Sequence, residues 1–191
     1  GRNGAETAYD HGCPPSRSCI LAGRMSEGHN STERAHALAS ALVNNGITHV
    51  VFSPGSRSTP LVVAFAALAP AITLHPVLDE RSAAFIALGM ARASREPVAL
   101  LCTSGSAPAH FLPATIEASA SHVPLVLLTA DRPADLHHCG APQTVDQLHM
   151  FGPHVRWSAD LPADSNRLDW TSAMAARAVA EATGSQPGPA Q

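Results

Sequence analysis

Short apolar runs alternate with longer segments of helical period along most of the chain. The apolar runs are rich in Val, Ile and Leu and stop at Gly, Ser or acidic residues, which is typical of buried strands. Ser31 or Thr32 can cap the first helical segment, and Gly46 can end it. We expect strands at residues 48–52, 72–78, 98–102 and 125–128, and helices at residues 33–44, 59–68, 80–93 and 107–119. This alternation predicts an α/β fold, a doubly wound parallel sheet with helices on both faces.

The alternation weakens after Asp131. A loop rich in His and Pro follows, then a short strand expected at residues 155–158 and a last helix expected at residues 168–183. The Gly- and Pro-rich segment 184–189 ends that helix.

Residues 1–24 show neither a helical nor a strand period. Gly, Arg, Asn, Cys and Pro are mixed there, and the apolar core of a signal peptide is missing. We interpret residues 1–24 as a disordered or extraneous extension, Met25 as a natural start, and residues 25–191 as one domain.

Composition excludes several classes of protein. Of the 191 residues, 45% are hydrophobic and only 14% are charged, which argues against disorder over most of the length. A net charge of −3 without a Lys/Arg cluster gives no nucleic-acid footprint, and no apolar run is long enough to span a bilayer. The four cysteines lack a Cys-x-x-Cys spacing and are interpreted as reduced thiols of a cytoplasmic protein.

Polar groups gather where the expected strands pass into helices. Ser53–Pro60 and Thr103–Ala107 are Gly/Ser turns of this kind, and Glu80 follows another strand directly. Because the carboxyl ends of parallel strands share one edge of the sheet, the three junctions predict one composite ligand site. Neither turn is a P-loop or a dinucleotide fingerprint. Taken alone, Asp79 and Glu80 are explained equally well by a helix dipole.

Five motifs then resemble a known family in the order in which they occur. They are Ser-Pro-Gly-Ser-Arg-Ser at 53–58, Asp-Glu-Arg-Ser at 79–82, Thr-Ser-Gly-Ser at 103–106, Leu-Thr-Ala-Asp-Arg-Pro at 128–133 and Cys-Gly-Ala-Pro-Gln at 139–143. Together they resemble the 2-succinyl-5-enolpyruvyl-6-hydroxy-3-cyclohexene-1-carboxylate synthases of menaquinone biosynthesis. The resemblance covers residues 32–191 and only the pyrimidine-binding domain of those thiamine diphosphate enzymes. In that family the segment after residue 184 leads into a further strand, and we expect this chain to stop before it.

The resemblance implies a catalytic role for Glu80. It occupies the position of the glutamate that hydrogen-bonds N1′ of the aminopyrimidine ring and thereby favours loss of the proton from thiazolium C2. Ser104 and Gly105 are likewise assigned to the cofactor. The family's Mg²⁺ or Mn²⁺ is held with the diphosphate by another domain, whose Gly-Asp-Gly motif does not occur here. The resemblance therefore implies that this chain holds no metal itself.

Both substrates implied by the resemblance, 2-oxoglutarate and isochorismate, are carboxylates. It assigns Ser56, Arg57, Arg132 and Gln143 to them, and a guanidinium can hold a carboxylate through two hydrogen bonds. On the residues alone, a solvated loop charge is the favoured interpretation of Arg57, and Asp131 could equally anchor Arg132 structurally. Arg81 is interpreted as a structural ion-pair residue.

Two departures from the family pattern affect positioning. Pro142 stands where an Asn is common, and His110 replaces another amide. His137, His138 and Cys139 adjoin one another, but without ligand spacing they are expected to be solvated loop residues rather than a metal site.

The resemblance also implies partners. A diphosphate-binding domain of a second subunit would complete the site in a homodimer or tetramer. Two alternatives remain: a stand-alone cofactor-binding or dimerisation module without catalysis, and part of another thiamine diphosphate carboligase.

Overall fold

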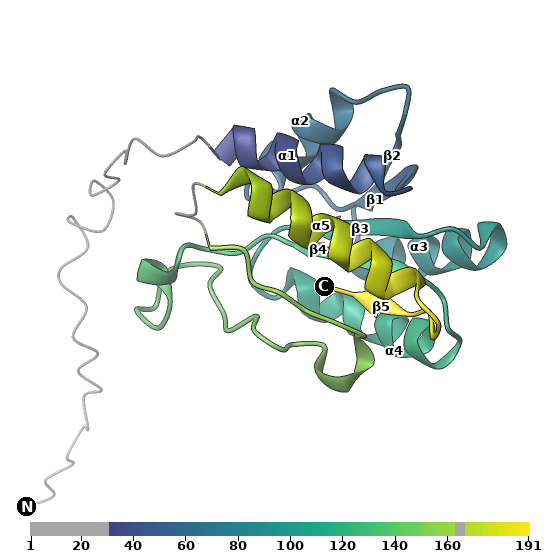
Figure 1. Cartoon of the computed structure of the whole chain (residues 1–191). Coiled ribbons are helices and arrows are strands. Elements are labelled where there is room, and N and C mark those ends of the chain that lie inside the picture. The colour runs from purple at the N-terminus through teal and green to yellow at the C-terminus, as the bar shows by residue number, and fades with distance from the viewer. Residues whose placement is uncertain (1–30, 163–166) are drawn as a thin grey trace, which may run out of the picture.

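A five-stranded parallel sheet forms the centre of the computed structural model, which describes residues 31–162 and 167–191 (Figure 1). The strand order is β2-β1-β3-β4-β5, and every pair is parallel. The strands are β1 His49–Phe52, β2 Thr73–Pro76, β3 Val98–Cys102, β4 Leu125–Thr129 and β5 Pro189–Ala190. The four strands predicted from the sequence before residue 130 are confirmed, with β2 shorter than predicted.

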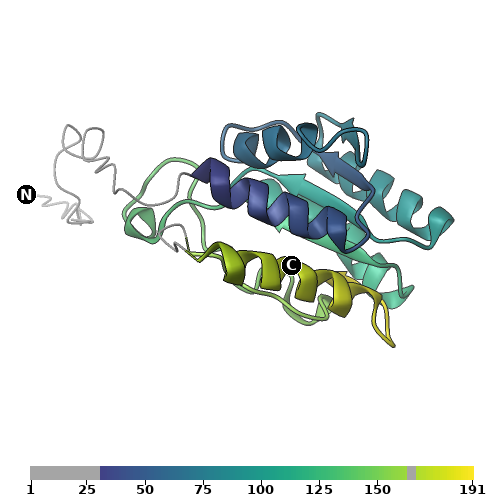
Figure 2. The same cartoon turned by 45° about the horizontal axis from the view of Figure 1, so that its top comes forward.

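Helices cover both faces of this sheet, as the sequence predicted. One face packs against α1 Ser31–Asn44, α2 Thr59–Ala66 and α5 Leu168–Thr183. The other packs against α3 Glu80–Ser94, the 3₁₀ helix η1 Ala107–Phe111 and α4 Leu112–Ala120. Figure 2 shows α1 and α5 side by side on their face. The α/β, doubly wound class is confirmed.

Strand residues supply both cores by their alternation. Val51 and Leu100 face the α3/α4 side, whereas Val50 and Leu101 face the α1/α5 side, and all four are fully buried. The covering helices present mainly alanine to the sheet, which allows close approach of helix and strand backbones. Every residue of β3 is buried, as expected for a central strand of a parallel sheet.

The helix predicted at residues 107–119 is divided. Its first five residues form η1, and α4 begins only at Leu112. Pro113 explains the break, because it has no N–H to donate to the carbonyl of Ala109 in an α-helical bond. Leu112 N–H bonds that carbonyl instead, in the tighter 3₁₀ pattern. Pro108 lies in the first turn of η1, where proline is tolerated.

The prediction that the chain stops before its next strand is wrong. Pro189 and Ala190 form β5, in register with Leu125 and Val126 of β4. Pro189 is the first residue of β5, a position where proline is tolerated although it has no N–H to pair. The strand expected at residues 155–158 is present only as a single parallel bridge between Trp157 and Ala190, after the 3₁₀ helix η3 Gly152–His154.

Several predictions lie outside the described residues, among them the extension 1–24, Met25 and the cysteines at positions 13 and 19. Within the described part of the chain, none of the helices is long and apolar enough to cross a membrane.

Candidate functional site at the carboxyl ends of the strands

The loops after β1 and β3 meet where the strand order reverses. The chain moves from β1 outward to β2 and then returns to the opposite side of β1 for β3, so the reversal lies between β1 and β3. Ligands of open α/β sheets bind in the crevice at such a point. Gly55 lies against Thr103 there: a Cβ on Gly55 would come within 2.7 Å of the Thr103 methyl carbon. Glycine at position 55 therefore lets the two loops touch.

The loop after β1 is closed by its own hydroxyl groups. Ser58 Oγ and Thr59 Oγ1 both donate to the carbonyl of Gly55, at 2.9 and 3.1 Å. Ser58 is fully buried, so this serine supports the loop rather than facing a ligand. Ser56 and Arg57 are exposed at the tip of this loop. Ser53 is also fully buried, and its Oγ has no hydrogen-bond partner in the described structure.

Gln143 is bound directly to the loop after β3. Its Nε2 donates to the backbone carbonyl of Ser104 at 3.0 Å, and the backbone carbonyl of Gln143 accepts from Ser104 Oγ at 3.1 Å. Gly105 has a φ of +85°, and a Cβ there would lie 2.7 Å from Gln143 Cγ. The structure therefore brings together three predicted site residues, Ser104, Gly105 and Gln143.

Gln147 belongs to the same cluster and was missed from the sequence. It is buried, its Oε1 accepts from the Gly105 N–H at 2.9 Å, and its Nε2 donates to the carbonyl of Ala130 at 3.1 Å. It thus ties the loop after β3 to the loop after β4. A single Gln in a polar loop carries no sequence signal for this role.

Arg57 and Arg132 share one electrostatic environment. Partial burial lowers the pKa of Arg57, and the positive charge of Arg132 lowers it further. Arg132 Nη2 donates to the carbonyl of Pro142 at 3.1 Å, while its Nε is buried without a hydrogen-bond partner in the described structure. Two neighbouring guanidinium groups with free donors are a suitable arrangement for an anion.

Asp131 does not anchor the guanidinium of Arg132. Its Oδ1 accepts from the backbone N–H of Arg132 at 2.6 Å, and its Oδ2 lies 3.6 Å from His137 Nε2. Burial raises the pKa of the Asp131 carboxyl, while the Arg132 N–H and His137 act in the opposite direction. The described structure therefore contains no ion pair between the side chains of Asp131 and Arg132.

Asp79 and Glu80 divide two roles at the start of α3. Asp79 caps the helix, since its carboxylate accepts from the Ser82 N–H at 2.7 Å, and this hydrogen bond lowers the pKa of Asp79. Glu80 is half-buried and has no such duty. Burial raises the pKa of Cys102, and the charge of Glu80 raises it further, which places the Glu80 carboxylate near the end of β3.

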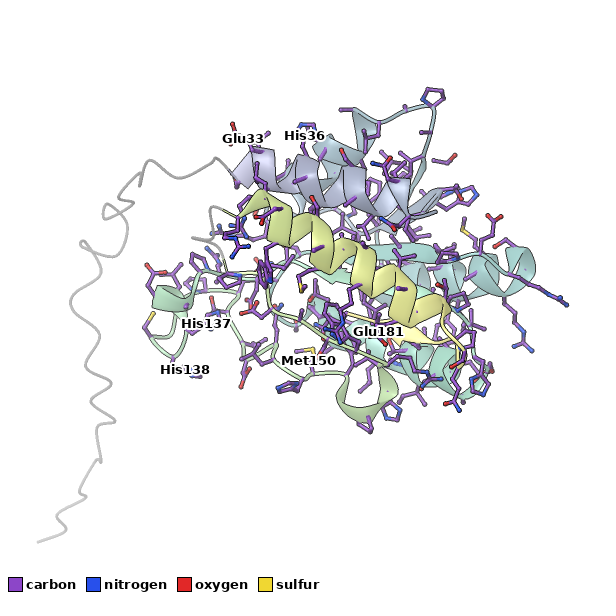
Figure 3. All side chains as sticks on the ribbon, viewed as in Figure 1. Glu33, His36, His137, His138, Met150 and Glu181 are labelled. Atoms are coloured by element: carbon purple, nitrogen blue, oxygen red, sulfur yellow. The ribbon has the colours of Figure 1, made fainter. Side chains whose placement is uncertain are left out.

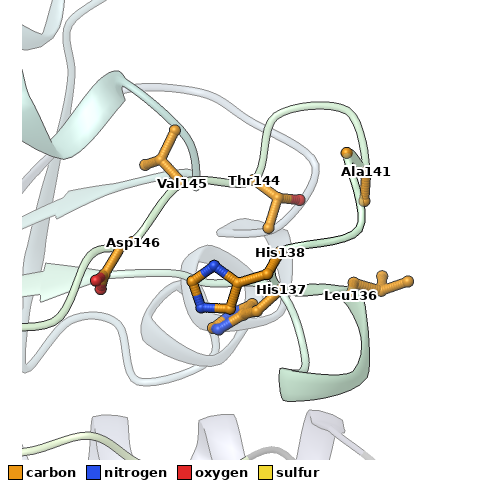
Figure 4. A pocket seen from close by; sticks show the side chains of 8 residues that line it. Leu136, His137, His138, Ala141, Thr144, Val145 and Asp146 are labelled. Carbon is orange, nitrogen blue, oxygen red and sulfur yellow. The ribbon is translucent and has the colours of Figure 1, made fainter. Parts of the chain in front are cut away.

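The loop histidines behave differently from each other. His138 is exposed, as expected, but His137 is half-buried and bonds the carbonyl of Arg132 at 3.0 Å, so the solvated interpretation of His137 is wrong. Figure 3 shows both on the loop that projects at the left of the view. They line a cavity of about 150 Å³ with Thr144, Val145 and Asp146 (Figure 4).

This small cavity is separate from the crevice. Its lining contains neither Glu80 nor Arg57, Arg132 or Gln143. The predicted site residues instead line the open carboxyl edge of the sheet in two groups, Glu80 near β3, and the arginine pair with the Gln143 cluster. Among the described residues, no hydrogen bond joins Glu80 to the other predicted site residues, and no group of three His, Cys, Asp or Glu is arranged to hold a metal ion.

A crevice of this kind, on this sheet order, belongs to a recognisable class of cofactor-binding domain. The family model "Thiamine pyrophosphate enzyme, N-terminal TPP binding domain" matches residues 32–150, and the chain belongs to that family.

Curated relatives specify the resemblance further. The chain is 50% identical over 168 residues to 2-succinyl-5-enolpyruvyl-6-hydroxy-3-cyclohexene-1-carboxylate synthase of Lysinibacillus sphaericus, covering 86% of this chain and 29% of the relative. It is 52% identical over 158 residues to the synthase of the same name from Geobacillus kaustophilus, covering 81% and 27%. The one from Haloarcula marismortui is 54% identical over 158 residues, covering 81% and 26%. The family indicated by the sequence motifs is confirmed, and the chain spans under a third of these relatives' length.

Proposed function

We propose that this chain is the pyrimidine-binding domain of a thiamine diphosphate-dependent synthase that joins 2-oxoglutarate, after decarboxylation, to isochorismate in menaquinone biosynthesis. The observation that carries the proposal is the grouping of Glu80, Arg57, Arg132 and Gln143 at one edge of the sheet, on a chain about half identical to synthases of that name. A transferase function follows from that reaction.

The donor set fits an aminopyrimidine ring. Glu80 stands at a helix start, half-buried and close to the buried end of β3, with the capping duty already taken by Asp79. A carboxyl group there can donate to and accept from a ring nitrogen. The buried Ser104 and Gly105 give the ring a polar wall of restricted mobility. The bound cofactor would supply the carbanion and the electron sink for decarboxylation.

Arg57 and Arg132 supply the charge that two carboxylate substrates need. Arg132 directs one donor to Pro142 and keeps others available, while Arg57 is exposed at a loop tip. Burial lowers the pKa of Arg57 and repulsion by Arg132 lowers it further, and a bound carboxylate would relieve that repulsion. Gln143 and Ser56 would add neutral hydrogen bonds. The carbonyl of Pro142 holds Arg132, so proline at this position still serves the site.

The proposal includes a second subunit. Leu78 is 88% exposed just before the Glu80 junction, and Phe85 and Ile116 are also exposed on the α3/α4 side. An apolar patch beside a site is typical of a protein interface. A diphosphate-binding domain of another subunit in a homodimer or tetramer would cover it and would bring Mg²⁺ or Mn²⁺. The same proposal places the protein in the cytoplasm.

Replacement of Glu80 by Gln in a complete enzyme carrying this domain tests the proposal. An amide cannot exchange a proton with a ring nitrogen, so turnover should fall about 10²- to 10⁴-fold while the circular dichroism spectrum stays unchanged. Glu96→Gln, at an exposed position far from the crevice, is the control. Near-normal turnover of Glu80→Gln would remove Glu80 from the mechanism. If the unsubstituted protein binds thiamine diphosphate but shows no turnover, the non-catalytic module is favoured instead.

A further inference from the structure

We propose that His137, together with Asp131, is a positioning residue that fixes Arg132 for a carboxylate substrate. The inference rests on the substrate role proposed for Arg132 and adds a residue for which the motifs gave no role. Both backbone groups of Arg132 are bound by side chains of its own loop.

Asp131 and His137 hold Arg132 from both sides of its Cα. The N–H of Arg132 donates to Asp131 Oδ1 at 2.6 Å, and its carbonyl lies 3.0 Å from His137 Nε2. Because a carbonyl only accepts, the hydrogen in this bond must be on Nε2 of the imidazole. Nε2 also lies 3.6 Å from Asp131 Oδ2, so the carboxylate attracts the same N–H.

The local fold brings His137 back to Arg132. The 3₁₀ turn η2 Ala134–Leu136 follows Pro133, with Leu136 N–H bonded to the Pro133 carbonyl at 2.9 Å and His137 N–H bonded to the Ala134 carbonyl at 3.1 Å. The side chains of His137 and Asp131 are 26% and 23% exposed. Figure 4 shows the His137 ring beside that of His138 at the wall of the small cavity. The two rings differ in that His138 is exposed.

A fixed backbone matters here because the guanidinium of Arg132 is only lightly held. One hydrogen bond, to the carbonyl of Pro142, orients it, and its Nε has no partner in the described structure. The positive charge of Arg57 repels the guanidinium of Arg132. Loss of the His137 contact would release the Arg132 carbonyl and widen the range of guanidinium positions. Substrate binding would weaken, while the chemistry at Glu80 would continue.

The test compares four single variants of the complete enzyme, Arg132→Ala, His137→Ala, His137→Gln and, as the matched control, His138→Ala, and one double variant. We expect Arg132→Ala to raise KM for one carboxylate substrate, and His137→Ala to raise the same KM about 3- to 10-fold with kcat little changed. His137→Gln keeps an N–H donor near the position of Nε2 and should restore most of the affinity. Thiamine diphosphate affinity should stay unchanged in all four. Adding His137→Ala to Arg132→Ala should have no further effect on KM, since His137 acts through Arg132.

The outcomes separate the inference from the function on which it rests. If Arg132→Ala raises KM and His137→Ala does not, the positioning role is wrong and the substrate role of Arg132 survives. If Arg132→Ala leaves both substrate KM values unchanged, the substrate role and the inference both fail. If His137→Ala raises KM, lowers kcat and weakens cofactor affinity to a similar degree, His137 has a general structural role and the inference is overturned. Should His137→Ala fail to fold, Asp131→Asn serves in its place, because it keeps an acceptor for the Arg132 N–H and removes the charge that faces His137.

Discussion

Arg156 and Arg132 lie at opposite ends of the parallel sheet and show how differently one residue type can be used. At the amino end, Arg156 donates to the carbonyls of Gln186 and Pro187, both at 3.0 Å, and to Ser119 Oγ and O at 2.9 and 2.8 Å. At the carboxyl end, Arg132 makes one side-chain hydrogen bond, to Pro142. An arginine whose three side-chain nitrogens all donate to its own chain supports the fold, whereas one with free donors near a second cation is available to an anion.

The two arginines also differ in how closely the backbone packs against them. Gly188 lets the Arg156 side chain lie on the backbone, since a Cβ there would come 2.6 Å from Arg156 Nε. At the other end, glycine at positions 55 and 105 brings loop to loop and leaves the arginines outside the contact. Glycine thus allows close packing of a structural arginine at one end of the sheet, and close contact between the loops of the candidate site at the other.

Of the effects expected from this comparison, the largest is on stability at the amino end. Arg156→Met removes the links that join the end of α4 to the turn before β5, and should lower the free energy of unfolding by about 2–4 kcal/mol. Urea denaturation of the chain measures it. Arg177→Met is the control, because Arg177 forms only an exposed pair with Glu181 and a contact over Trp157. Equal losses for both variants would mean that Arg156 does not support the fold as described.

Arg57→Ala should impair substrate use and leave stability nearly unchanged, the reverse of what is expected for Arg156→Met. The loss of a charge-assisted hydrogen bond is worth about 1.5–3 kcal/mol, which corresponds to a roughly 10- to 100-fold weaker use of a carboxylate substrate in the complete enzyme. The free energy of unfolding should change little, since Arg57 is exposed. Separate titration of each substrate and of thiamine diphosphate decides the matter, with the exposed Arg92 replaced by Ala as the control. A defect confined to cofactor affinity would contradict the assigned role.

The smallest effect concerns a pair of histidines on β1 and β2. His49 Nδ1 and His75 Nε2 lie 3.1 Å apart, and burial followed by the charge of His49 lowers the pKa of His75 below 6.5. A lowered folded-state pKa gives stability that is present above about pH 6.5 and is lost as pH falls through the folded pKa. Urea midpoints at pH 7.5 and 5.5 should therefore differ less in His75→Gln than in the unsubstituted chain. His138→Gln is the control, and an unchanged pH dependence in His75→Gln would show that His75 is not the source.

The alternation of apolar runs and helical segments predicted most of this fold, because buried parallel strands and amphipathic helices leave a direct mark on the sequence. The prediction failed where single contacts decide the structure. Pro113 divides one helix through a missing N–H, and β5 has only two residues, too few to show a period.

The candidate site follows the same division. The motifs predicted Glu80, Arg57 and the Ser104–Gly105 turn, since strand-to-helix junctions are visible in sequence. Gln147 and His137 could not be predicted, because their roles depend on loops that return from residues distant along the chain or bend back on themselves. Whether Ser56, Arg57, Glu80, Ser104, Gly105, Arg132 and Gln143 act on cofactor and substrates stays a prediction.

Hydrogen–deuterium exchange of the complete enzyme tests the central claim most directly, namely that the carboxyl end of this sheet is the binding end. Thiamine diphosphate with Mg²⁺, followed by 2-oxoglutarate, should slow exchange in peptides covering residues 53–59, 79–82 and 103–106, because a bound ligand suppresses local opening. Peptides covering residues 119–123 and 184–188, around Arg156, should exchange at the same rate with and without ligands. Protection confined to the Arg156 end, or no ligand-dependent protection at the three carboxyl-end loops, would contradict the account.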